Sequence, residues 1–232
     1  MVNTMKSKNR KLICFEGMDG SGKSTLSIII ADDLRQYGYS VYYLRWLDGE
    51  DTILKKMLWF LSQGNAKSSS NDQEKPIHKS ISKKNILTHF YVALVLFNYL
   101  WFGLVRIRIA RFIKNYDIFI IDRYYFDVVL SICREFGYSP STLEKMLNLF
   151  KKILPEPDLF IFIIVSSSLA YQRKPDEFLS LEQAQIKEQL HNELFLLIGN
   201  QIKCHQIYFD NTQGVDESAK ELGGRIQSYL LI

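Results

Sequence analysis

Residues 15–25 read Phe-Glu-Gly-Met-Asp-Gly-Ser-Gly-Lys-Ser-Thr, and the segment from Gly17 to Ser24 matches the pattern G-x-x-x-x-G-K-S. Glycines at these positions let the backbone point successive N–H groups inward, which makes a nest for anions. An apolar run over residues 11–15 precedes the segment, and apolar residues at helical spacing follow it from Leu26 to Leu34. A strand, a glycine-rich loop and a helix in this order predict a P-loop that binds the phosphates of a nucleotide.

The P-loop pattern assigns a role to each of its residue types. Lys23 is expected to bring positive charge to the outer phosphates of ATP, and the Ser24 hydroxyl to ligate Mg²⁺. The predicted nucleotide-binding residues are Gly17, Met18, Asp19, Gly20, Ser21, Gly22, Lys23, Ser24 and Thr25.

A second cluster of charge follows the apolar run at 118–121, where Asp122 and Arg123 are adjacent. P-loop enzymes hold a carboxylate near Mg²⁺ at the end of a buried strand, so Ser24 and Asp122 are the predicted metal ligands. Arg123 is expected to offset negative charge on the phosphates during transfer. An ordinary solvated ion pair at a strand end is the alternative.

Two further basic positions are candidates for the same crevice. Arg45 follows a strand-like segment, and parallel sheets bind ligands at the carboxyl ends of their strands, although a surface arginine beside Trp46 would look the same. Arg173 precedes a proline-containing break between two helical segments, which predicts a short lid over about 173–180 that carries charge to the phosphate. The predicted catalytic residues are Lys23, Asp122, Arg123 and Arg173.

Length and composition indicate a single domain over residues 1–232. The 29 basic and 25 acidic residues nearly balance at a net charge of +4, which offers no reason to expect nucleic acid as a partner. The three cysteines are far apart in sequence, as in a protein with reduced thiols. With no apolar run ahead of residue 11, we expect no signal peptide and a cytoplasmic location.

Strand-like and helix-like segments alternate along the chain. The predicted strands cover residues 11–15, 40–46, 117–122, 159–165 and 206–210; the predicted helices cover about 23–37, 53–61, 86–113, 123–136, 140–154, 167–173, 181–198 and 215–230. This alternation predicts an α/β fold with a parallel sheet wrapped by helices on both faces. The polar segment at about 62–84 is expected to be a mobile loop.

The stretch from 90 to 105 lacks charged residues but contains Asn98. It is shorter than a typical membrane span, so a buried core helix is predicted and no span is expected, with peripheral membrane association as the alternative. The three tryptophans, Trp46, Trp59 and Trp101, are also predicted to lie in the core.

Residues 15–25 and the triplet 122–124 (Asp-Arg-Tyr) together resemble the thymidylate kinase family of nucleoside monophosphate kinases. Weaker similarities are the triplets 44–46 and 157–159 and the lid arginine. The resemblance implies a three-layer P-loop sandwich with a five-stranded parallel sheet. It also implies ATP and Mg²⁺ as cofactors, γ-phosphoryl transfer to a nucleoside monophosphate, and commonly a homodimer.

The resemblance also implies roles on the acceptor side. Asp19 would contact the acceptor sugar, Arg45 the acceptor phosphate, and Arg123 would bridge donor and acceptor phosphates. Gly20 occupies a place where some members carry an arginine, which would shift that charge to Arg173. The predicted acceptor-site residues are Asp19, Arg45 and Asp127.

Departures from the family pattern also fall on the acceptor side. Acidic Asp48 and Glu50 follow the second strand where a basic residue is usual, Asp127 stands where a serine is common, and an expected arginine near residues 97–99 is missing. Extra carboxylates would repel an incoming monophosphate but accept hydrogen bonds from hydroxyls. A kinase of a sugar or polyol, or a non-catalytic nucleotide-binding regulatory protein, therefore stays open as an alternative.

Overall fold

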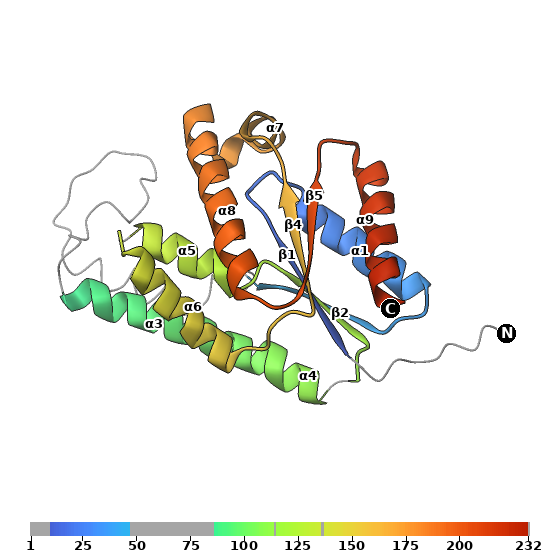
Figure 1. Ribbon diagram of the computed structural model, residues 1–232, viewed down its shortest axis with the longest axis horizontal. Coiled ribbons are helices and arrows are strands. Elements are labelled where there is room, and N and C mark those ends of the chain that lie inside the picture. Colours follow the sequence, from blue (N-terminus) through green and yellow to red (C-terminus); the bar gives the residue numbers. More distant parts are fainter. Residues whose placement is uncertain (1–9, 47–85, 114, 136, 232) are drawn as a thin grey trace, which may run out of the picture.

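The computed structural model describes residues 10–46, 86–113, 115–135 and 137–231, and its centre is a five-stranded parallel sheet in the spatial order β2-β3-β1-β4-β5 (Figure 1). The strands are β1 (Lys11–Glu16), β2 (Val41–Arg45), β3 (Ile118–Asp122), β4 (Leu159–Ile164) and β5 (His205–Asp210). Every pairing between neighbouring strands is parallel. The predicted α/β class with a five-stranded parallel sheet is confirmed. The predicted helix at 53–61 and the loop at 62–84 lie outside the described residues, as do Asp48, Glu50 and Trp59.

Helices cover both faces of the sheet (Figure 1). The helices are α1 (Lys23–Gln36), α3 (Ile86–Gly103), α4 (Ala110–Ile113), α5 (Tyr125–Glu135), α6 (Pro140–Ile153), α7 (Ser167–Arg173), α8 (Leu181–Gln201) and α9 (Val215–Leu230), with a π-helical stretch at Leu104–Ile109 and a 3₁₀ turn, η4, at Pro175–Glu177. Helices α1 and α9 pack on one face, and α3, α5, α6 and α8 pack on the other.

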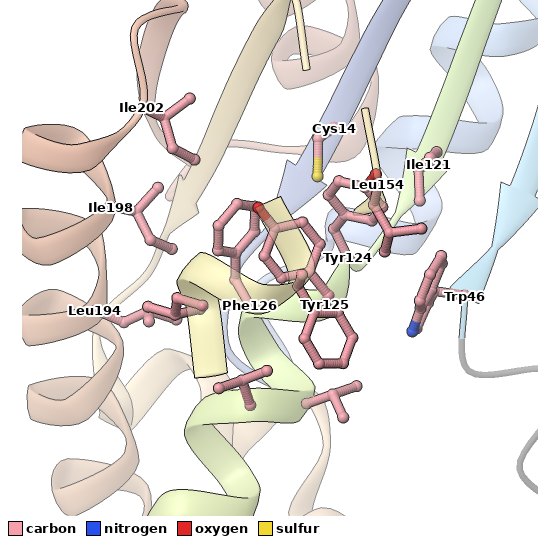
Figure 2. Packing of buried hydrophobic residues seen from close by; sticks show 14 of the residues in the cluster. Cys14, Trp46, Ile121, Tyr124, Tyr125, Phe126, Leu154, Leu194, Ile198 and Ile202 are labelled. Atoms are coloured by element: carbon pink, nitrogen blue, oxygen red, sulfur yellow. The ribbon is translucent and has the colours of Figure 1, made fainter. Parts of the chain in front are cut away.

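The unbroken apolar runs of the strands follow from this double covering. In β1, Leu12 and Cys14 pack into the core under α5, α6 and α8, whereas Ile13 and Phe15 pack under α1 and α9. A strand buried on both faces has no solvent side to fill with polar residues. Figure 2 shows the first of these cores, where the aromatic start of α5 lies between the sheet and α8.

Helix α3 differs from the prediction of a core helix. Val92, Val95 and Leu96 are buried, but Phe97 is 64% and Trp101 58% exposed. The prediction that Trp101 is buried is therefore wrong, because among the described residues the core contacts only one side of α3. Trp46 is buried as predicted. Residues Val92–Ile109 have a mean hydropathy of 1.6 and are long enough to cross a membrane, but one such helix is weak evidence for a span.

The strand register brings the ends of three strands to one edge. Phe15 of β1 and Arg45 of β2 are both paired with Asp122 of β3. Since all strands are parallel, the segments that leave their carboxyl ends share this edge of the sheet.

Candidate functional site

The glycine loop (residues 17–24) connects β1 to α1 at the carboxyl edge of the sheet. Gly20 and Gly22 have φ angles of 79° and 86°, a left-handed conformation that costs residues with a Cβ about 1–2 kcal/mol. Gly20 also lies against α7, since a Cβ there would come within 2.5 Å of the carbonyl oxygen of Ala170. The predicted sequence of strand, glycine loop and helix is present, and α7 packs directly on the loop.

We expect Gly20→Ala to destabilise the protein by about 3 kcal/mol or more, since both the backbone angle and the Ala170 carbonyl oppose a Cβ. Gly38→Ala is the matched control, because Gly38 has a φ of 90° but open space around its Cβ position. That control should lose only about 1–2 kcal/mol. Urea unfolding of both variants measures the difference; equal losses would mean that α7 moves aside without cost.

Lys23, the first residue of α1, folds back over the glycine loop. Its Nζ donates a hydrogen bond to the Met18 carbonyl oxygen at 3.0 Å and lies 3.7 Å from Oδ1 of Asp19. Burial and the positive charge of Arg123 lower the pKa of Lys23. The lysine is therefore held beside the loop backbone, in a place where a bound anion would favour its charged form.

An asparagine that the sequence patterns did not single out braces the other side of the loop. Asn211 follows β5, is buried, and its Nδ2 donates a hydrogen bond to the Ser21 carbonyl oxygen at 2.7 Å. Only the fold could reveal this contact, because 190 residues separate the two partners.

Asp122 ends β3 with its side chain fully buried. Its Oδ2 accepts a hydrogen bond from the Tyr43 hydroxyl at 3.2 Å and lies 3.9 Å from Nε of Arg45. Burial and the charge of Asp122 raise the pKa of Tyr43 to about 12. The other oxygen, Oδ1, has no hydrogen-bond partner among the described residues. A buried carboxylate oxygen without a partner is a candidate ligand for a cation or its water.

A chain of hydroxyl groups joins Asp122 to the start of α1. Ser27 Oγ lies 3.4 Å from the Tyr43 hydroxyl and donates a hydrogen bond to the Ser24 carbonyl oxygen at 3.0 Å. Both predicted metal ligands, Ser24 and Asp122, are thus connected through Ser27 and Tyr43. The sequence patterns did not indicate these two linking residues.

Arg123 adopts a left-handed backbone with a φ of 64°, and its N–H donates to the Phe15 carbonyl oxygen at 2.9 Å. Its guanidinium donates through one nitrogen to Asp19 and through the other to Oδ2 of Asp127 at 2.5 Å. Burial lowers the pKa of Arg123, but Asp127 and Asp19 outweigh it and raise the pKa above its ordinary value. Such strained backbone at a strand end is typical of functional sites, because the turn aims the side chain. Three of the predicted site residues, Asp19, Arg123 and Asp127, therefore form one ion-pair network.

Two residues of α8, four positions apart, complete the network. Lys187 Nζ lies 3.3 Å from Oδ2 of Asp19, and His191 Nε2 lies 3.9 Å from Oδ1 of Asp127. Burial alone would raise the pKa of Asp19, but Lys23, Arg123 and Lys187 together hold it well below its ordinary value. Sequence reasoning missed both α8 residues; their helical spacing was visible, but not the direction of that face of α8.

Glu16, at the end of β1, is a buried carboxylate at the floor of the site. Its Oε1 accepts a hydrogen bond from the Tyr124 N–H at 2.6 Å, whereas Oε2 has no partner within the described ranges. Burial and the nearby charge of Asp127 raise the pKa of Glu16 well above its ordinary range. The folded state therefore favours the protonated acid.

Glu16→Gln should leave the free energy of unfolding unchanged or raise it at pH 8. A raised folded pKa contributes stability that is present below the unfolded pKa of about 4.3 and is lost as the pH rises through the folded value. Glutamine keeps an acceptor for the Tyr124 N–H and has no charge to bury. Urea unfolding at pH 5 and pH 8 tests this, with the exposed Glu221→Gln on α9 as control. A variant that loses more stability at pH 8 than at pH 5 would contradict the raised pKa.

Arg173 is the one predicted catalytic residue that is exposed. It lies at the end of α7, and no hydrogen bond or ion pair joins it to the glycine loop in the part of the chain that the structure describes. The predicted lid region holds the end of α7, η4 and the start of α8. It packs on the loop through a small cluster, in which Met18 contacts residues of α7 and α8. Thr25 is exposed on the first turn of α1.

The sequence was also compared with known proteins. Neither models of known protein families nor curated proteins give a match to this chain.

Proposed function

We propose that this protein is an ATP- and Mg²⁺-dependent phosphotransferase of the thymidylate kinase type. It transfers the γ-phosphoryl group of ATP to a nucleotide or nucleoside, with dTMP as one candidate acceptor. The observation that carries the proposal is that Lys23, at the start of α1, and Arg123, directly after Asp122 at the end of β3, both contact Asp19 of the glycine loop. Catalysis in such a site consists of positioning and charge stabilisation, without a covalent intermediate.

The donor half uses the loop and the start of α1. The left-handed glycines support a nest of N–H groups for the phosphates, and the helix adds the positive end of its dipole. Lys23 already lies over the loop and needs little movement to reach an outer phosphate. The strand order, with this loop after the central strand, supports a P-loop fold.

The residues present fit a Mg²⁺ ion. Asp122 offers a buried oxygen without a described partner, and the half-buried Ser24 offers a hydroxyl at the start of α1. Oxygen ligands from one carboxylate and one hydroxyl, with the phosphates, are typical of Mg²⁺ in phosphotransferases. The ion would offset the charge of the phosphates during transfer.

The acceptor half centres on Arg123 and the two carboxylates that hold it. Asp19 fixes the guanidinium from the loop, and Asp127 fixes it from α5. With the backbone strained at the same residue, the guanidinium is pre-organised to bridge donor and acceptor. Arg45, near Asp122 at the neighbouring strand end, is the proposed contact for an acceptor phosphate.

Asp127 supports a second candidate, a kinase whose acceptor carries hydroxyls but no phosphate. Asp127 is only 6% exposed and its carboxylate contacts Arg123, so it belongs to the site and not to the outer surface. A carboxylate at this position accepts hydrogen bonds from hydroxyls and repels a monophosphate.

A screen of acceptors by ATP consumption tests the proposal. Wild-type protein with ATP and Mg²⁺ should accelerate ATP consumption with at least one of dTMP, dUMP, thymidine or another nucleoside. Acceleration only by sugars or polyols would favour the second candidate. If the protein binds ATP but no acceptor accelerates ATP consumption, both kinase candidates fail and a non-catalytic nucleotide-binding role takes their place.

A further inference from the structure

Helix α8 presents Lys187 and His191 to the two carboxylates that hold Arg123. The five side chains alternate in the order Lys187, Asp19, Arg123, Asp127 and His191, with each contact made to a different carboxylate oxygen. The α8 residues are therefore part of the same network as the glycine loop. The proposed function as stated above gives neither of them a role.

The charges of this network do not balance. Lys23, Arg123 and Lys187 surround Asp19, and Asp127 is the second carboxylate in contact with Arg123. Three cations against two carboxylates leave an excess of positive charge beside the loop, since the nearby Asp122 is paired with Arg45 and the raised pKa of Glu16 favours its uncharged acid. Because the side chains of Lys23 and Arg123 are only 5% and 16% exposed, water screens this excess poorly. An anion bound among them would remove the imbalance.

Two groups besides Asp19 position the ammonium group of Lys187 near the site. Its Nζ lies 4.8 Å from the centre of the Phe178 ring and 3.5 Å from the Glu177 carbonyl oxygen. Both residues belong to the segment between α7 and α8. The side chain of Lys187 is 26% exposed, so it can be reached by a ligand from solution.

We infer that Lys187 is a phosphate-binding residue, which contacts the phosphoryl group where it passes from donor to acceptor. The inference rests on the proposed function. It gives a role to a cation of α8 that the sequence patterns did not indicate, whereas the predicted lid residue Arg173 is exposed at the end of α7. Lys187 would bind either the γ-phosphate of the donor or the phosphate of the acceptor; both are the same chemical group.

Calorimetric binding to full-length protein with Mg²⁺ tests the inference without turnover. The donor arm compares a non-hydrolysable ATP analogue with ADP, and the acceptor arm compares dTMP with thymidine. If Lys187 binds the donor, Lys187→Met should lower the affinity for the ATP analogue by about tenfold or more and the affinity for ADP by less than about twofold. If it binds the acceptor, the same changes should appear for dTMP and thymidine. Lys187→Arg should restore most of the affinity, which a merely structural role would not predict.

Lys220→Met is the matched control, since Lys220 is an exposed lysine on α9, outside the glycine loop and the predicted lid. It should change none of the four affinities. Two affinity ratios decide the question: ATP analogue to ADP, and dTMP to thymidine. If Lys187→Met leaves both ratios at their wild-type values, Lys187 serves only to neutralise Asp19 and the inference is overturned. If wild-type protein binds neither the ATP analogue nor ADP, the proposed function fails, and that result is distinct from the first.

Should Lys187→Met fail to fold, as judged by circular dichroism, Lys187→Gln takes its place. This variant keeps a polar group next to Asp19 but removes the charge. The same ratios then decide the question.

Discussion

Lys23→Ala should reduce ATP turnover on the order of 10²- to 10³-fold, with the loss mainly in kcat. The lysine approaches the loop from the first turn of α1 and is the only described cation that both begins the helix and contacts the loop backbone. Its removal takes away an electrostatic interaction with the phosphates that is stronger in the transition state than in the ground state. Steady-state kinetics with the acceptor found in the screen give the measurement.

The fold of this variant should persist. Burial and Arg123 lower the pKa of Lys23, so the charged form is disfavoured in the folded state and its loss relieves a cost. Arg35→Ala, at the exposed far end of the same helix, is the control and should keep full turnover. Turnover retained in a folded Lys23→Ala protein would mean that the phosphates bind elsewhere.

Arg123→Gly should reduce kcat even further, on the order of 10³-fold or more, because the guanidinium that stabilises charge in transfer is lost. Glycine is chosen because the residue has a φ of 64°, which glycine adopts without strain. The backbone turn after β3 is thereby kept. Relief of the backbone strain at residue 123 offsets about 1–2 kcal/mol of the loss in the free energy of unfolding. Kinetics and urea unfolding are measured on the same preparation.

Stability should nevertheless fall by about 2–3 kcal/mol, since Asp127 is left buried without the arginine and its remaining neighbour, His191, lies 3.9 Å away. The double variant Arg123→Gly/Asp127→Asn removes that unpaired charge and should regain most of the stability but none of the turnover. A double variant that regains turnover would exclude Arg123 from the chemistry. A single variant as stable as wild type would show that His191 is sufficient to compensate the charge of Asp127.

The fold was largely predictable because its signals are local. Apolar runs between helical segments indicated β1, β3 and β4, and their lack of alternation indicated a sheet covered on both faces. Ser180 caps α8 by accepting a hydrogen bond from the Gln183 N–H, as its position before a helical segment suggests. The orientation of α3 was not predictable, since an apolar helix looks the same in sequence whether one side or every side is buried.

The candidate site was predictable only in part. Gly20, Lys23 and Asp122 belong to patterns with fixed spacing, so their meeting at one edge of the sheet followed from the motif and from parallel strands. Arg123 was recognised by its place after Asp122, but nothing in the sequence indicated its left-handed backbone or its two carboxylate partners.

By itself, the sequence determined the parallel sheet, the glycine loop after its first strand and the acid at the end of its third strand. These depend on the hydrophobic period and on glycine's backbone freedom, both of which act over a few residues. Only the tertiary structure decided that Lys187, 168 residues from Asp19, contacts its carboxylate, while Arg173 is exposed at the end of α7. The rotation of α8 about its axis sets which charges enter the site, and that rotation is fixed by packing of Leu194, Phe195 and Ile198 against the sheet.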